Sequence, residues 1–196
     1  MKYLAFFIVG IFVITSVALS QSQKGNGNII KKDFQISNVE KISNLTSANI
    51  IINQSGTESM TVELDENLMQ FFEYKGSNNH IEIHFSKNKI SPTKFNVYLN
   101  VTGLRSLENT GSGNISTTNT IKSNEFDFEH TGSGNSDINV SSKSFKSEVT
   151  GSGNTKITSD AAVCSFEHTG SGNTIFINEN KNSIIKFEHT GSGNTD

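Results

Sequence analysis

The strongest pattern in this chain is Thr110-Gly111-Ser112-Gly113-Asn114, because the same pentapeptide returns at residues 131–135, 150–154, 169–173 and 190–194. Successive copies begin 21, 19, 19 and 21 residues apart. A period near 20 residues is typical of stacked repeats, each forming one coil of the stack. Leucine-rich repeats share this period but need a leucine framework that is missing here. The calcium-binding glycine-rich repeat is shorter and uses Asp where this chain has Asn.

The residues before each pentapeptide alternate between apolar and polar side chains, which is the period of a β-strand with one buried face. Stacking the repeats in register predicts two inward columns. These are Phe126, Phe145, Cys164 and Ile185, and Phe128, Ser147, Phe166 and Phe187. Gly-Ser-Gly then turns the chain, because glycine adopts positive φ without penalty. The expected fold is all-β, a parallel β-helix or β-roll solenoid with coils of about 20 residues.

Residues 21–107 lack the pentapeptide but keep short β-prone runs, such as 48–52, 80–85 and 95–101, with turn signals between them. We find no linker that would separate this half from the repeats. We therefore expect a single domain over residues 21–196, with irregular coils over 21–107 and repeat coils over 108–196.

The composition excludes several classes of protein. Of the 196 residues, 33% are hydrophobic and 18% are charged, and the formal net charge is −3. A nearly neutral chain lacks the basic surface of a nucleic-acid-binding protein, so we expect no nucleic-acid partner. The single cysteine, Cys164, leaves no intramolecular disulfide. It falls in an inward column, where we interpret it as a small buried hydrophobic residue.

Residues 1–20 have the pattern of a secretory signal peptide: Lys2 precedes an apolar run over residues 4–19, and Ser20 ends a small-residue cleavage site. The alternative is a retained membrane anchor, because the run just reaches the minimum length for a span. The small residues and the polar segment that follows favour cleavage. We therefore expect export to the periplasm, the outer cell surface or the medium, with membrane contact only through the signal peptide during export.

Several segments occur in a specific order, namely residues 34–39, 48–54, 67–69, 80–84, 95–99 and 104–114, followed by the later Gly-Ser-Gly repeats. In this order they resemble the bacterial family described as the putative auto-transporter adhesin head, or GIN domain. The resemblance covers roughly residues 30 to 196. It implies a right-handed β-helical fold, export and a role in adhesion, and the family offers no catalytic residues to assign.

A row of carboxylates is the sharpest candidate binding site. It consists of Glu108, Glu129, Glu148, Glu167 and Glu188, which share one phase of the repeat. Neighbours about 4.8 Å apart repel by only ~0.9 kcal/mol in water, whereas burial of the row would be prohibitive, so it must face solvent. We interpret the row as a solubilising stripe in which Lys146 and Lys186 reduce the repulsion between the carboxylates. The alternative is a site for divalent cations or a cationic glycan.

Two further rows share a phase of the repeat. His130, His168 and His189 point toward the core side, and Val149 at the same phase favours packing over metal binding, with His168 and His189 as the pair if ligation occurs. The second row is interpreted as a turn ladder whose side-chain amides hydrogen-bond between coils, with carbohydrate binding as the alternative. Its members are Asn114, Asn135, Asn154, Asn173 and Asn194.

Our first hypothesis is a non-enzymatic envelope protein of adhesion type that binds a polysaccharide or a cell surface. The rivals are a polysaccharide-acting enzyme and a purely structural envelope protein. A uniform row does not single out the carboxylate pair that glycan cleavage needs, so we expect no catalytic residue, no metal and no cofactor. Because Asp196 directly follows a turn, we also expect an uncapped last coil through which copies form homo-oligomers. The alternative is that the chain is a fragment of a longer protein in which a further coil completes the stack.

Overall fold

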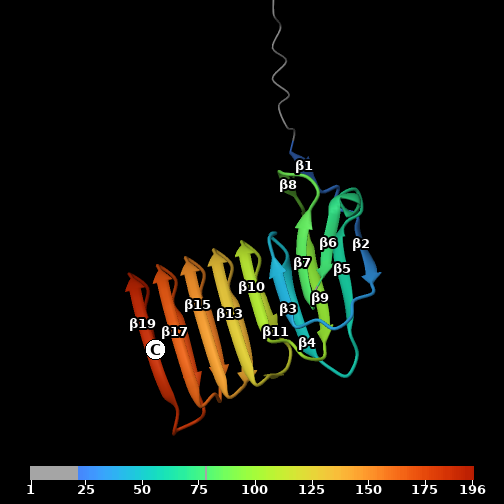
Figure 1. Cartoon of the computed structure of the whole chain (residues 1–196). Helices are drawn as coiled ribbons and strands as arrows, with labels where there is room; N and C mark the ends of the chain where they lie inside the picture. Colours follow the sequence, from blue (N-terminus) through green and yellow to red (C-terminus); the bar gives the residue numbers. More distant parts are fainter. Residues whose placement is uncertain (1–21, 78) are drawn as a thin grey trace, which may run out of the picture.

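The computed structural model describes residues 22–77 and 79–196 and shows two large β-sheets (Figure 1). Their inward side chains form one hydrophobic core that runs from Ile36 to Phe166 in the sequence. A short pair of strands, β1 (Gln23–Lys24) and β8 (Ile90–Ser91), stands apart from both sheets. The expected signal peptide, residues 1–20, lies outside the described residues.

The first sheet has eight strands and joins the two halves of the chain. Its order is β19 (Ile184–Gly191), β17 (Val163–Gly170), β15 (Ser144–Gly151), β13 (Glu125–Gly132), β10 (Ser106–Gly111), β3 (Lys41–Asn44), β7 (His80–Phe85) and β6 (Phe72–Ser77). Strands β10, β13, β15, β17 and β19 are the last strands before each pentapeptide turn. They lie side by side from the centre of Figure 1 to its left edge.

The second sheet also draws on both halves. Its order is β18 (Thr174–Asn178), β16 (Thr155–Ser159), β14 (Ser136–Ser141), β11 (Ile115–Thr117), β4 (Asn49–Gln54), β9 (Phe95–Val101), β5 (Ser59–Asp65) and β2 (Ile29–Phe34). Strand β12 (Ile121–Lys122) pairs with β14 off this path, and a 3₁₀ turn, η1 (Met69–Phe71), precedes β6.

The expectation of one parallel β-helix over residues 21–196 is wrong, because the sheets are mixed. Strands β2 and β5, β5 and β9, and β6 and β7 pair antiparallel. The period-2 alternation on which the expectation rested is the same in parallel and antiparallel strands, so it could not distinguish them. Asn79 shows how the chain reverses between β6 and β7: its φ of 62° is the left-handed conformation that tight hairpins use.

In the repeats, by contrast, every pairing between β10 and β19 is parallel and in register. Phe126, Phe128, Phe145 and Phe166 are at most 2% exposed, as the alternation predicted. The last strand differs from the expectation. Ile185 and Phe187 are 46% and 40% exposed, because no described strand covers them.

The glycines of the pentapeptide permit an unusually close approach between successive turns. Gly151 has a φ of 144°, and a Cβ built on it would overlap the backbone carbonyl oxygen of Gly132. Gly153 stands in the same relation to Gly134, although its φ is not in the positive range. The first glycine is therefore required by both conformation and space, and the second by space alone.

Replacing Gly151 by Ala should lower the free energy of unfolding by about 1–3 kcal/mol, because the methyl group would be strained and would press on Gly132. Ser152→Ala, at the next and exposed position, should change it by less than about 0.5 kcal/mol. Urea titration of both variants tests this, and equal losses would contradict the close-approach argument.

Candidate functional site

The outward surface of the eight-stranded sheet carries three parallel rows of polar side chains, which we call the charged face. The strand register places Glu108, Glu129, Glu148, Glu167 and Glu188 opposite one another as the Glu row. Two residues earlier runs a mixed row of Lys41, Ser106, Asp127, Lys146, Ser165 and Lys186. Two residues later runs the exposed Thr row, which contains Thr110, Thr131, Thr150, Thr169 and Thr190.

Every second carboxylate of the Glu row is neutralised by a lysine of the mixed row. The Glu108 carboxylate lies 3.1 Å from the Lys41 ammonium, and Lys186 lies 2.8 Å from Glu188. Lys146 pairs with Glu148 in the same way. Among the described residues, Glu129 and Glu167 have no ion pair, because the mixed row holds Asp127 and Ser165 at their positions.

Glu108 is the most tightly held member of the row. The Ser43 hydroxyl donates a hydrogen bond of 2.8 Å to its carboxylate. That bond, with Lys41 beside it, lowers the pKa of Glu108 below its ordinary value. Its side chain is 27% exposed, against 57% for Glu188 at the other end of the row. The Glu108 end of the row is therefore held by hydrogen bonding and partly buried, whereas the Glu188 end is exposed to solvent.

A shallow hollow of about 270 Å³ lies on the charged face. Its lining includes Lys41, Glu108, Glu129, Lys146 and Glu148. Both signs of charge meet there, with the unpaired Glu129 between two ion-paired carboxylates. This arrangement can hold hydroxyl groups and a cation through exposed polar atoms.

The Asn row lies beside the glycine turns, on the exposed surface, and links each turn to the next. The backbone N–H of Asn135 donates to the Asn114 side-chain oxygen at 2.8 Å, and Asn154 donates to Asn135 at 2.9 Å. Asn173 and Asn194 continue the chain of bonds at 3.0 Å each. The side-chain amides thus bond between coils, each through its oxygen, which accepts from the backbone N–H of the next Asn in the row.

The three histidines point inward, behind the charged face. His130 and His168 are at most 1% exposed, and each Nδ1 lies within 3.0 Å of a hydroxyl, that of Ser136 or Thr174. His189 is placed in the same way against Thr195, at 3.1 Å. The Nε2 atoms of all three lack a hydrogen-bond partner among the described residues. Across residues 22–77 and 79–196, no three or more metal-ligating side chains come together in a group that could hold a metal ion.

Burial lowers the pKa of both His130 and His168, and in His168 the neighbouring His189 adds to the effect. Burial therefore favours the neutral form of both imidazoles. Cys164 is also buried, and burial raises the pKa of its thiol, which disfavours the reactive thiolate.

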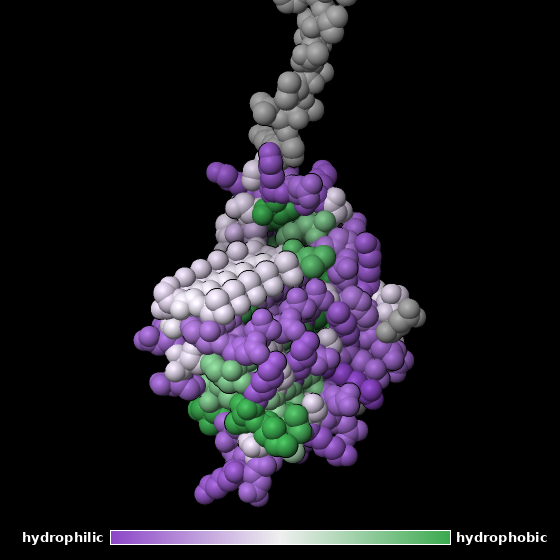
Figure 2. Space-filling model, turned by 60° about the vertical axis from the view of Figure 1, so that its left-hand side comes forward, coloured by the Kyte–Doolittle hydropathy of each residue, from purple (hydrophilic) through white to green (hydrophobic). Residues whose placement is uncertain are grey.

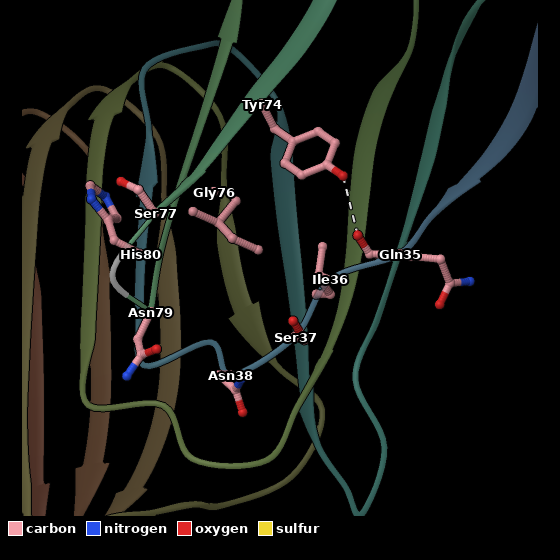
Figure 3. A pocket seen from close by; sticks show the side chains of 10 residues that line it. Gln35, Ile36, Ser37, Asn38, Tyr74, Gly76, Ser77, Asn79 and His80 are labelled. Carbon is pink, nitrogen blue, oxygen red and sulfur yellow. Dashed lines mark hydrogen bonds between the residues drawn. The ribbon is translucent and has the colours of Figure 1, made fainter.

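A second hollow, of about 610 Å³, was not anticipated from the sequence (Figure 3). It lies between the segment that follows β2 and the hairpin of β6 and β7, and Tyr74, Gln35, Asn38 and His80 contribute to its lining. The Tyr74 hydroxyl donates to the Gln35 carbonyl at 3.2 Å. The sequence predicted the β-prone run over residues 80–85 but gave no indication that residues 35–38 lie opposite it.

Comparison with known proteins identifies the family. The model of the family described as "Putative auto-transporter adhesin, head GIN domain" matches residues 38–196. The chain belongs to this GIN-domain family. The resemblance inferred from the sequence is thereby confirmed, and the family description supports an adhesion-like binding role.

Solved structures share the fold of this GIN domain. A structure described as a putative lipid binding protein from Parabacteroides distasonis has a TM-score of 0.60 at 19% identity, covering 89% of this chain and 98% of its own. A putative adhesin from Bacteroides fragilis has a TM-score of 0.63 at 17% identity, covering 88% and 98%. The sequence has no significant match among curated proteins. Within the described part of the chain, no helix is long and apolar enough to span a membrane.

Acidification should destabilise the protein between about pH 7 and pH 5. Because the folded-state pKa of His130 and His168 is lowered, the unfolded chain takes up protons first as the pH falls below about 6.5. Above that pH the histidines are neutral in both states and have no effect. Carboxylates with a lowered pKa, such as Glu108, lose their stabilising charge only near and below about pH 4.

The matched variant is His130→Val with His168→Val, because Val149 already occupies this position in the repeat between them. The double variant should flatten the fall in unfolding free energy between pH 7 and pH 5, measured by urea titration at several pH values. An unchanged slope would show that other groups cause the acid sensitivity.

Proposed function

We propose that this GIN domain is a non-enzymatic adhesin that binds a polysaccharide or other repeating cell-surface polymer through the charged face. The observation that carries the proposal is the alternation along the Glu row. Glu129 and Glu167 have no ion pair with any residue that the structure describes, while the carboxylates beside them are neutralised. With strands about 4.8 Å apart, unpaired carboxylates recur about every 9.6 Å.

A repeating polymer suits this surface better than a small ligand. The face is open and its hollow is shallow, so one small molecule would bury little area, whereas a chain lying across several strands would repeat each contact. Unpaired carboxylates accept hydrogen bonds from sugar hydroxyls and attract ammonium groups, and the Thr row adds a hydroxyl on every strand, about 4.8 Å apart. We therefore favour a glycan that carries amino groups, with many weak contacts acting together.

The rival functions have less support. An enzyme that cleaves glycans needs two carboxylates in different environments, but the unpaired members of the Glu row repeat the same exposed setting. A lipid would need an apolar cavity, whereas all the lining residues of the hollow on the charged face are charged or hydroxyl-bearing except Phe128. A purely structural envelope protein remains the outcome if no glycan binds.

The organisation of the whole chain fits an exported adhesin. We propose that residues 1–20 are a signal peptide cleaved after Ser20 and that residues 21–196 act as one domain in the periplasm, on the cell surface or in the medium. Strands from both halves contribute to each large sheet, which supports a single unit. We also propose that copies associate through the C-terminal strand, which would place two charged faces in one assembly.

A glycan array probed with the protein purified after expression of the full chain tests the ligand. We expect binding to amino-bearing polysaccharides, and Glu129→Gln with Glu167→Gln should weaken it by tenfold or more in a titration. The matched control is Asp137→Asn, because Asp137 is an exposed carboxylate on the other sheet. Equal binding by both variants would exclude the charged face as the site, and an array without binding would favour the structural role.

A further inference from the structure

The outer edge of β19 is an open sheet edge. No strand among the described residues pairs with it, since β19 stands at the end of its sheet with β17 as its one neighbour. Ile184, Ile185 and Phe187 are 71%, 46% and 40% exposed. Figure 2, which brings this end of the molecule forward, shows an apolar patch low on its surface. Open edges with exposed apolar residues are templates for pairing with another strand.

The second sheet is more closed at the same end. Residues Thr195 and Asp196 run beside β18, where the Asp196 N–H donates to Thr174 and the Asp196 carbonyl accepts from Phe176, at 3.0 and 2.9 Å. The first residues of β18 therefore already have backbone partners. A strand added at this end of the molecule would therefore pair with β19, because no described segment lies along the outer side of β19.

The backbone direction of β19 determines which groups face outward. The Ile184 N–H donates to the Ala162 carbonyl at 2.8 Å, so it points toward β17. Because backbone groups alternate along a strand, those of Ile185, Phe187 and His189 point away from β17. These outward N–H and C=O groups are what a second strand would bond.

The side chains of β19 select one way of pairing. We propose that two copies of this chain form a closed dimer in which the two β19 strands pair antiparallel about a two-fold axis through Phe187. In that register Lys186 of each copy lies directly opposite Glu188 of the other, on the same outward face. This inference rests on the proposed self-association and adds its geometry.

Other registers are less favourable. A shift by one residue would place inward side chains on the outward face, which the pleat of the sheet forbids. A shift by two residues in one direction places Lys186 opposite its own copy, and in the other direction places Glu188 opposite its own copy. Like charges directly opposite each other destabilise antiparallel pairs. The Phe187-centred register is the one near the middle of β19 that pairs opposite charges at both positions.

The same axis also completes the hydrophobic core. A two-fold axis perpendicular to the first sheet keeps the inward sides of both copies on one side, so their second sheets also meet. Phe187 already stacks on Phe166, with ring centroids 5.0 Å apart. In the dimer its exposed side would face Phe187 of the second copy, and Ile185 would lie opposite His189. Closed two-fold pairing uses one surface in both copies, so it stops at two.

Sedimentation velocity of the protein purified after expression of the full chain, over a wide concentration range, tests this register. We expect a monomer–dimer equilibrium. Lys186→Glu should weaken dimerisation by roughly tenfold or more, because it places two pairs of like charges across the axis. Lys186→Glu combined with Glu188→Lys should restore it, since the opposite charges meet again. The matched control Lys146→Glu changes the same position in β15, inside the sheet, and should leave dimerisation unchanged.

Hydrogen exchange gives a second readout that does not depend on charge. The backbone amides of Phe187 and His189 should exchange more slowly at high concentration, whereas that of Ile184 is already bonded. A strictly monomeric protein would overturn the proposal, whether or not glycans bind. Dimers unaffected by Lys186→Glu, or not restored by the double exchange, would overturn the register. Open-ended polymers would overturn the closed symmetry.

Discussion

Close stacking of the Thr-Gly-Ser-Gly-Asn turns is the constraint on which the rest of the structure depends. At Gly132 and Gly151 the turns approach so closely that a Cβ would overlap the carbonyl oxygen of the turn before it. The Asn side-chain oxygens add one hydrogen bond per turn at 2.8–3.0 Å. Because each turn is held in the same position above the last, the strands that enter it must stay in register. This register places the inner phenylalanines in one row and the outer carboxylates in another.

The repeats were therefore open to prediction, whereas in the first half the sequence predicted strands such as β7 and β9 but not how they pair. In residues 106–191 the pentapeptide fixes the phase, so alternation alone places Phe128 inside and Glu129 outside. Residues 22–101 lack that marker, and alternation says which face is buried without saying which strand is adjacent or in which direction it runs. Strand β9 illustrates this, because it pairs parallel with β4 and antiparallel with β5. The overextended prediction of a parallel β-helix came from applying the rule of the second half to the first.

The candidate site was also only partly predictable from the sequence. The Glu row and its exposure follow from the repeat, but the contacts that distinguish its members do not. Lys41 and Ser43, which hold Glu108, come from β3, and no local pattern connects them to β10. The hollow near Tyr74 likewise depends on how residues 35–38 lie beside the β6–β7 hairpin. Long-range placement of this kind is set by packing of the whole chain.

The fold does not require the unpaired carboxylates, which is why the proposed function rests on them. Adjacent charges about 4.8 Å apart on an exposed sheet cost only ~0.9 kcal/mol each, so the fold tolerates them, yet nothing in it requires them. Lysine at Asp127 and Ser165 would pair Glu129 and Glu167 as Lys146 pairs Glu148, within the same strand geometry. The chain instead keeps an acid and a hydroxyl at those positions. A surface that binds a repeating cationic or hydroxyl-rich polymer would need carboxylates that are exposed, regularly spaced and not already occupied by its own lysines.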